Sequence, residues 1–151
     1  MSTATLPTQT TTDETAILTL LDSMLRANHD KRAAAFAAQF APHAAIYNLA
    51  PPLVHHGVDI VEKQGWFDSW ATPIDLEPRD FKVSVSGDLA FCHGFLRMTG
   101  TKKGADGAVD FWMRETLCLA RVVDTWKIVH EHTSVPFYMD GTFRPAFDLQ
   151  P

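Results

Sequence analysis

The segment Trp126-Lys127-Ile128-Val129-His130-Glu131-His132-Thr133-Ser134-Val135-Pro136 decides the fold of this chain. It follows the turn signal Val-Val-Asp-Thr, is rich in β-branched and aromatic residues, and ends at a proline, which has no N–H to donate to a sheet. We therefore expect one long strand. Because side chains alternate between the two faces of a strand, the even-numbered residues from Trp126 to Ser134 should share one face. The odd-numbered residues Val129, Glu131 and Thr133 should share the other.

Helical patterns precede residue 73. Thr11 and Glu14 form a capping-box signature, and apolar residues then recur at helical spacing as far as Asn28. Asp30 can cap a second, short, alanine-rich helix that Pro42 ends. The spacing predicts a third helix from Gly57 to about residue 70, with a short strand over 43–48 between the second and third helices.

Alternating patterns and turns fill the rest of the chain. Residues 81–86, 89–101 and 109–121 read as strands, and with the opening segment they form an antiparallel meander. Helices followed by a long sheet predict an α+β fold with the helices on one sheet face. We expect one domain over residues 13–151, preceded by a disordered leader over residues 1–12.

The composition limits the partners that we expect. Thirteen Lys and Arg against 18 Asp and Glu give a net charge of -5, and no basic stripe is present, so nucleic acid is not an expected partner. No apolar run is long enough to cross a bilayer, so no membrane partner is expected. Two cysteines without metal spacing fit the reducing cytoplasm. Without a phosphate loop, a nucleophile elbow or paired cysteines, we expect no cofactor.

Several motifs together resemble the SnoaL-like, ketosteroid-isomerase-like proteins of the nuclear-transport-factor-2-like superfamily. These motifs are Asn48-Leu49-Ala50-Pro51-Pro52-Leu53, Gly57, Ser86-Gly87-Asp88-Leu89-Ala90-Phe91-Cys92-His93, Trp112-Met113-Arg114 and His130-Glu131-His132-Thr133-Ser134-Val135-Pro136-Phe137. The resemblance implies a cystatin-like, cone-shaped α+β barrel, in which a curved, mostly antiparallel sheet wraps around the N-terminal helices and leaves one deep pocket. A shared fold does not by itself give the chemistry.

The resemblance also allows a comparison with the isomerase triad. It places the base aspartate of the isomerases on Asn48, their tyrosine on Met24 and their protonated aspartate on Thr116. An amide cannot shuttle a proton from carbon, and methionine donates no hydrogen bond. Steroid isomerisation by the usual triad is therefore not expected.

The resemblance implies which residues line the pocket. It turns Val129, Glu131 and Thr133 inward, with Trp112, Arg114 and Thr116 on the adjoining strand, and it turns the outer face, including His130 and His132, toward a second copy. A looser similarity to the association domain of calmodulin-dependent kinase II turns Arg97, His93 and Phe95 inward. The expected catalytic residues are Glu131, His93, Arg114 and Arg97. The expected ligand-binding residues are Asn48, Trp66, Trp70, Phe95, Trp112, Thr116, Val129 and Thr133.

Each of these side chains also has a purely structural interpretation. Glu131 is either a general acid or base or the partner of an arginine in a buried ion pair. His93 is either a proton carrier or an ordinary core histidine. His130 and His132 point the same way on a regular strand, but no third ligand follows at a suitable spacing, so we expect a dimer contact and no metal site.

Three functions remain open from the sequence. The first is an enzyme of the isomerase, cyclase or dehydratase kind that needs no cofactor and acts by proton transfer on a small hydrophobic carbonyl or acidic compound. The second is a module that binds such a molecule, carboxylates included, without converting it. The third is a pure dimerisation domain, which predicts a filled cone. In each case we expect a homodimer through the open sheet face.

Overall fold

A computed structural model describes residues 8–151, with side chains from residue 12 onward. This part of the chain forms three helices and six strands. They are α1 (Thr8–His29), α2 (Ala33–Ala37), β1 (Phe40–Tyr47), β2 (His55–His56), α3 (Ile60–Asp68), β3 (Asp75–Ser86), β4 (Leu89–Gly100), β5 (Val109–Val122) and β6 (Thr125–Ser134). No helix within residues 8–151 has the length and apolar character needed to cross a membrane.

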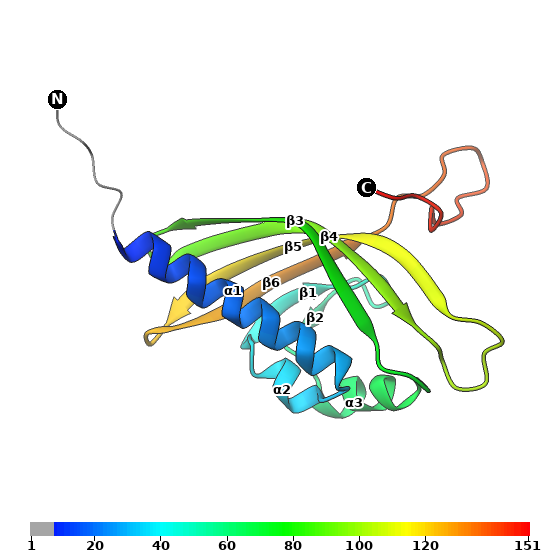
Figure 1. The fold of residues 1–151 in the computed structure, drawn as a ribbon, viewed down its shortest axis with the longest axis horizontal. Helices are drawn as coiled ribbons and strands as arrows, with labels where there is room; N and C mark the ends of the chain where they lie inside the picture. Colours follow the sequence, from blue (N-terminus) through cyan, green and yellow to red (C-terminus); the bar gives the residue numbers. More distant parts are fainter. Residues whose placement is uncertain (1–7) are drawn as a thin grey trace.

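The strands form one curved sheet in the order β2-β1-β6-β5-β4-β3. Strand β1 runs parallel to β6, and all other neighbours are antiparallel. Figure 1 shows α1 lying along the concave side of the sheet, with α2 and α3 at one end. The predicted α+β fold is confirmed, but the sheet is open, with β2 and β3 as its edges, and does not close into a barrel.

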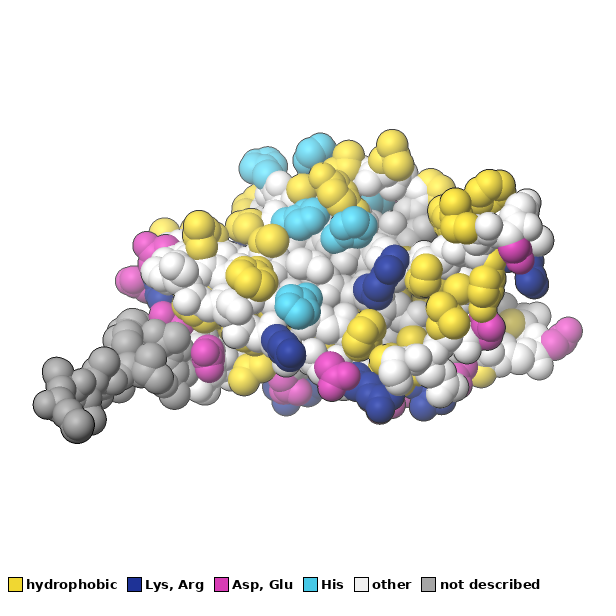
Figure 2. Space-filling view, turned by 90° about the horizontal axis from the view of Figure 1, so that it is seen from above, with side chains coloured by type: hydrophobic (Ala, Val, Ile, Leu, Met, Phe, Trp, Pro, Cys, Tyr) yellow, Lys and Arg dark blue, Asp and Glu magenta, His cyan; other side chains and the backbone are white. Residues whose placement is uncertain are grey.

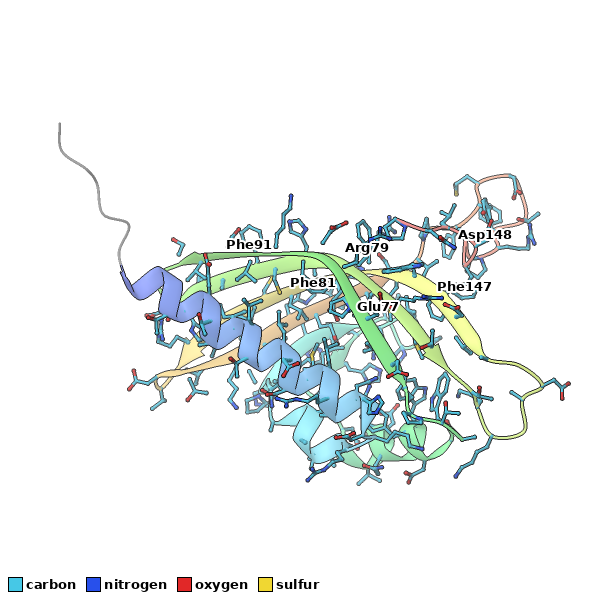
Figure 3. All side chains as sticks on the ribbon, viewed as in Figure 1. Glu77, Arg79, Phe81, Phe91, Phe147 and Asp148 are labelled. Carbon is cyan, nitrogen blue, oxygen red and sulfur yellow. The ribbon has the colours of Figure 1, made fainter. Side chains whose placement is uncertain are left out.

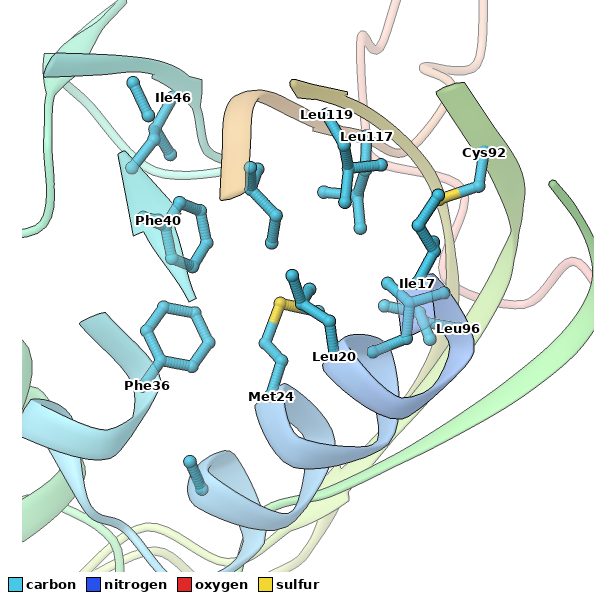
Figure 4. Packing of buried hydrophobic residues seen from close by; sticks show 14 of the residues in the cluster. Ile17, Leu20, Met24, Phe36, Phe40, Ile46, Cys92, Leu96, Leu117 and Leu119 are labelled. Atoms are coloured by element: carbon cyan, nitrogen blue, oxygen red, sulfur yellow. The ribbon is translucent and has the colours of Figure 1, made fainter. Parts of the chain in front are cut away.

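Helix α1 is held by its apolar stripe. Ile17, Leu20 and Met24 recur at the three- and four-residue spacing that puts side chains on one helix face, and all three are buried. Figure 4 shows this face directed at Leu117 and Leu119 of β5. Burial of such side chains contributes about 1.5–3 kcal/mol each, so this contact fixes α1 across the sheet.

A partly buried ion pair anchors α1 at the end of the sheet away from α3. The Asp13 carboxylate accepts a hydrogen bond from Arg121 Nη2 at 2.6 Å and another from Trp126 Nε1 at 3.3 Å. Arg121 also donates to Asp88 in the β3–β4 turn at 3.0 Å. One carboxylate therefore ties α1 to β5 and β6.

Several boundaries differ from the predicted ones. Helix α1 begins at Thr8, so residues 8–12 of the expected leader are helical, and its residues 1–7 lie outside the described residues. Strand β1 begins at Phe40 and passes through Pro42, which is tolerated because the β1–β6 ladder is interrupted between Phe40 and Ala45. Strand β3 begins at Asp75 and keeps Pro78 because an edge strand has one unpaired side. The short strand β2 was not predicted.

Candidate functional site

A cavity of about 280 Å³ lies between the concave side of the sheet, α1, α3 and the loop over residues 48–51. Figure 1 shows α3, which forms one side of this cavity, at the same end of the molecule as α2. Most of the wall is apolar. The polar lining residues are Asn28, Asn48, His55, Asp59, Glu62, Lys63, Glu115, Glu131 and Thr133. Their side chains decide what the cavity can do.

Glu115 and Glu131 form a pair of buried carboxyl groups. Glu115 on β5 lies opposite Thr133, and Glu131 on β6 lies opposite Leu117, so the two glutamates are diagonal neighbours on adjacent strands. They are 3% and 7% exposed, and their side chains are hydrogen-bonded to each other. Two carboxyl groups can form such a bond only when one of them carries a proton.

The surroundings place that proton on Glu115. Burial, and then the charge of Glu131, raises the pKa of Glu115 well above its ordinary value. Burial also raises the pKa of Glu131, but Lys63 and the hydrogen bond from Glu115 oppose this rise. Among the described residues no group donates to the buried Oε2 atom of Glu115, which also disfavours an anion there. The pair therefore holds a proton more tightly at Glu115 than at Glu131.

Lys63 faces this pair from α3. Its Nζ atom lies 4.3, 4.5 and 4.8 Å from the ring centroids of Phe36, Trp66 and Phe67. Burial lowers the pKa of Lys63 to about 8, against the attraction of Glu131, which raises it. The cation–π contacts also favour the ammonium form, so Lys63 carries its proton at neutral pH more often than not.

Two hydrogen-bonding residues fix the position of Lys63. Asp59 caps α3, because its Oδ1 atom accepts from the N–H of Glu62 at 2.9 Å. Gln64 accepts from the N–H of Ala33 at 3.0 Å and donates to the carbonyl of Lys31 at 3.0 Å. The helix that carries Lys63 is therefore held against the segment between α1 and α2.

A β-bulge at Val129 turns Glu131 inward. Cys118 pairs with His130 and Leu119 pairs with Ile128, so Val129 is an extra residue in β6. Ile128 is fully buried and Glu131 lines the cavity, although a regular strand would place residues 128 and 131 on opposite faces. The inward orientation of Glu131 and Thr133 is confirmed. The expectation that Trp126 and Ile128 share the outer face with His130 and His132 is wrong, because the bulge separates the two halves of the strand.

The expected helpers of Glu131 lie on the other face of the sheet. Inward positions of β4 and β5 belong to Leu96, Met98, Met113 and Glu115, so their neighbours in sequence point outward. Arg97 pairs with Asp110 at 2.8 Å, and Arg114 donates to Ser134 at 3.0 Å. His93 stacks on Phe91 with the ring centroids 6.4 Å apart. Placing Arg97, Arg114 and His93 in the cavity is therefore corrected.

The expected ligand-binding residues divide in the same way. Asn48, Trp66 and Thr133 line the cavity. Trp70 is buried beside Trp66 but does not reach the cavity, and Val129 is the bulge residue. Those on the outer face of β4 and β5 are Phe95, Trp112 and Thr116.

His130 and His132 lie on the outer face, where Tyr47 packs against both rings with centroid distances of 4.7 and 5.3 Å. His130 Nδ1 lies 2.7 Å from the carbonyl oxygen of Ala45. Within the described residues no group of three or more His, Cys, Asp or Glu side chains is arranged to hold a metal ion.

Sequence reasoning missed the two partners of Glu131, although both left a signal. Glu115 interrupts an alternating apolar row of β5 formed by Phe111, Met113, Leu117 and Leu119, where a charge needs a reason. Lys63 stands four residues before Phe67 and therefore on the inward face of its helix. Of the positions compared with the isomerase triad, Asn48 and Met24 line the cavity, and so does Glu115, the neighbour of Thr116.

Comparisons with known proteins agree with this architecture. A family model described as a SnoaL-like domain matches residues 17–138. The chain is similar to an NTF2-like protein of unknown function from Pseudomonas putida KT2440, with 26% identity, 93% of this chain and 98% of that chain covered, and a TM-score of 0.82. No match was found among curated proteins.

Two further solved structures share the fold. One is a proposed dehydratase of the NTF2-like family from Streptomyces avermitilis, with 18% identity, 82% and 96% coverage of this chain and that chain, and a TM-score of 0.70. The other is a proposed scytalone dehydratase from Novosphingobium aromaticivorans DSM 12444, with 12% identity, 93% and 97% coverage and a TM-score of 0.75. At these identities the likeness concerns the fold alone.

Proposed function

Since this chain belongs to the SnoaL-like domain family, we propose that its cavity binds a small hydrophobic carbonyl compound and transfers protons on it without a cofactor, as a dehydratase or isomerase does. The observation that carries this proposal is the pair of buried glutamates, Glu115 and Glu131, in an apolar cavity, where burial and the neighbouring charge favour a proton on Glu115. A base and an acid held side by side are the two groups that such a reaction needs.

Dehydration of a β-hydroxy carbonyl compound uses both groups. Glu131 takes the proton from the carbon next to the carbonyl, and Glu115 gives its proton to the leaving hydroxyl group. The C–H and C–O bonds break, a C=C bond forms and water leaves. The pair ends with the one proton that it had at the start, now on Glu131, and a transfer between the two carboxyls restores the first state.

Lys63 supplies the positive charge for this chemistry. The carbonyl oxygen of the substrate becomes negative as the C–H bond breaks, and an ammonium group at the cavity wall stabilises that charge. We assign to Lys63 the role expected earlier for Arg97 or Arg114. The apolar wall, with Met24, Trp66 and Met113, suits a hydrophobic substrate and strengthens these electrostatic interactions by excluding water.

Hydrogen exchange tests the proposal without a known substrate. Cyclic ketones and β-hydroxy ketones are incubated with the protein in heavy water, and NMR follows deuterium uptake and water loss. We expect wild type to accelerate exchange, Glu131→Gln to abolish it, and Glu115→Gln to slow loss of water more than exchange. The matched control is Glu77→Gln on the edge strand β3. Exchange in Glu131→Gln at the wild-type rate removes Glu131 from the mechanism.

A binding module is the second candidate, and Asn48 favours it. This amide lines the cavity at the position that the resemblance assigns to the isomerase base, so the site lacks that base. A module binds ketones or carboxylates with no exchange in wild type. Mass analysis of a ligand that co-purifies distinguishes the binding module from the enzyme, because a binding module leaves its ligand chemically unchanged. The cavity itself argues against a domain used only for dimerisation.

We also propose a homodimer through the outer face of the sheet. Phe91 and Leu89 are 48% and 64% exposed there. Figure 2 shows hydrophobic and histidine side chains gathered over the middle of this face, and Figure 3 shows Phe91 at its surface. Phe91→Lys should give a monomer in light scattering, and Val61→Lys on α3 should leave the dimer intact. A monomeric wild type contradicts the proposal.

The proposed location is the cytoplasm, where thiols stay reduced. Cys92 and Cys118 are both free. Burial raises the pKa of the Cys92 thiol to about 12, so this thiol takes no part in the proposed chemistry.

A further inference from the structure

We infer that Lys63 is a nucleophilic amine that forms an imine with an aldehyde or ketone bound in the cavity. This inference deepens the proposed function, because both use the same cavity, but it assigns a covalent step that proton transfer alone does not require. The substrate class is a small hydrophobic compound with an unhindered carbonyl group.

The position of Lys63 suits attack on a bound carbonyl. Its side chain lines the cavity, and three aromatic rings surround its Nζ atom. Among the described residues, Nζ makes no hydrogen bond and no salt bridge with a carboxylate within 4.0 Å. Glu131 acts on it only through its charge. No acceptor therefore has to be displaced before the nitrogen approaches a ligand.

The other lysines lack this combination. Lys31 donates to the carbonyl of Trp70 at 2.9 Å and Lys127 donates to the carbonyl of Ala38 at 2.5 Å. Lys102 donates to Ser69 at 3.4 Å. Lys82 and Lys103 are exposed. Within the described chain, Lys63 is the lysine that lines the cavity.

The charge state of Lys63 agrees with this geometry. Burial lowers its pKa to about 8 from 10.5, so the fraction of neutral amine at pH 7 is more than roughly a hundredfold larger than for an exposed lysine. The titratable groups around the cavity are His55, Asp59, Glu62, Glu115 and Glu131. Of these, Glu131 is the one whose charge raises the pKa of Lys63, and burial outweighs it.

The acid pair supplies the proton transfers of imine formation. Nζ attacks the carbonyl carbon, a C–N bond forms, and the carbonyl oxygen takes the proton of Glu115. Glu131 removes a proton from the new ammonium group. Glu131 then gives this proton to the resulting hydroxyl group, which leaves as water while a C=N bond forms, and the N–H proton of the iminium passes to Glu115. The sum is amine plus carbonyl giving imine plus water, and no oxidant or reductant takes part.

Reductive trapping tests the inference on the intact protein. Wild type is treated at neutral pH with cyclohexanone or benzaldehyde and cyanoborohydride, which reduces an imine to a stable secondary amine. Each adduct adds the mass of the probe less one oxygen atom, and peptide mapping locates it. We expect the first adduct on Lys63, formed about tenfold or more faster than on Lys82. This preference should shrink as the pH rises above the pKa of an exposed lysine.

Two variants sharpen the result. Lys63→Arg keeps the charge and cannot form the imine, so its fastest adduct should be lost, whereas Lys82→Arg should label at residue 63 as wild type does. If a variant fails to fold, the peptide map of the wild-type protein still tests the inference, because it compares Lys63 with Lys82 in one protein. Equal labelling of Lys63 and Lys82 in wild type, or labelling of surface lysines only, overturns the inference.

Reductive trapping tests the imine and hydrogen exchange tests the proposed function, so one result can be negative while the other is positive. An adduct on Lys63 without deuterium uptake supports the imine and contradicts the proposed function. Deuterium uptake that survives in Lys63→Arg, with no adduct in wild type, supports proton transfer by the glutamates and overturns the imine.

Discussion

Glu115 and Glu131 share one hydrogen bond inside the cavity although each lies opposite a different residue of the neighbouring strand. The diagonal arrangement keeps both carboxyls at the cavity wall. It also joins their protonation, because the charge on one raises the pKa of the other. The two carboxyl groups therefore titrate as one unit.

The first prediction concerns this unit and pH. A carboxyl whose pKa is raised by folding holds its proton more tightly in the folded state than in the unfolded chain. The stability that Glu115 contributes is complete below its ordinary pKa of 4.5 and is lost as the pH rises through the folded-state value. Glu115→Gln keeps the shape and a donor but cannot ionise. As the pH rises above about 5, its unfolding free energy should increase relative to wild type.

Urea unfolding followed by tryptophan fluorescence measures this difference. Glu14→Gln on the exposed side of α1 is the control and should change little with pH. A difference between Glu115→Gln and wild type that stays constant as the pH rises contradicts a raised pKa. Lys63 is present in both proteins, so its own titration cancels.

The second prediction concerns Lys63, where the sign is opposite. Folding lowers the pKa of this amine, so its contribution to stability is present above 10.5 and is lost as the pH falls through about 8. Lys63→Met keeps the apolar stem without the charge. It should raise the unfolding free energy by about 1–2 kcal/mol at about pH 6, and less at about pH 9.

Thermal melts at the two pH values measure the effect, with Lys82→Met as the exposed control. If Lys63→Met lowers stability equally at both values, the cation–π contacts with Phe36, Trp66 and Phe67 outweigh burial, and the lowered pKa is wrong.

The third prediction concerns Gly94, which lies opposite Glu115 on β4. A Cβ atom at this position would lie 2.4 Å from Cδ2 and 2.9 Å from the Cα atom of Phe81, so part of the clash is with backbone. Gly94→Ala should destabilise the protein by about 1–3 kcal/mol. Because displacing Phe81 admits water near Glu115, the pH dependence of the first prediction should also weaken.

Chemical denaturation measures this cost. Gly107→Ala is the matched control, since a Cβ there meets nothing within 4 Å. Equal stability of the two variants would show that β3 shifts freely at its bulge between Arg79 and Lys82.

The fourth prediction compares two aspartates of α1. Asp13 is 6% exposed at its side chain and pairs with Arg121, whereas Asp22 is 62% exposed and pairs with Arg26 at 2.8 Å. Asp13→Asn removes the buried one of the two carboxylates that pair with the partly buried guanidinium of Arg121, leaving the exposed Asp88, and should cost about 2–4 kcal/mol. Asp22→Asn should cost less than about 1 kcal/mol. Similar losses of unfolding free energy for both variants would mean that the contacts of Asp13 with Arg121 and Trp126 stabilise the protein no more than an exposed ion pair does.

Much of the fold could be predicted from the sequence because periodic patterns were strong. The apolar stripe of α1 and the alternation after residue 80 gave the helices, the meander and the α+β class. The ends of β1 and β3 could not be predicted, because Pro42 and Pro78 look like breaks until an irregular ladder or an edge position accommodates them.

The site was harder to predict for a physical reason. On β4 and β5 both faces carry large apolar side chains: Leu96 and Met113 point inward, and Phe91 and Trp112 point outward. The alternation of side chains along these strands then does not reveal which face is buried, and Arg97 and Arg114 were assigned to the wrong face. Glu131 was placed correctly through the resemblance, since spacing alone does not reveal the bulge at Val129.

The extra residue at Val129 divides β6 into two halves in which the inward-facing positions differ in parity. Ile128, before the bulge, packs in the core, and Glu131 and Thr133, after it, line the cavity. Ile128 lies before the bulge and stays in the core whatever the register of the residues after Val129. If the second half shifted its register by one residue and the bulge were lost, His130 would face the cavity and Glu131 would face the outer side of the sheet. The same sequence would then place an imidazole beside Glu115 where it now places a carboxylate, so the strand register decides which titratable groups line the cavity as much as the composition does.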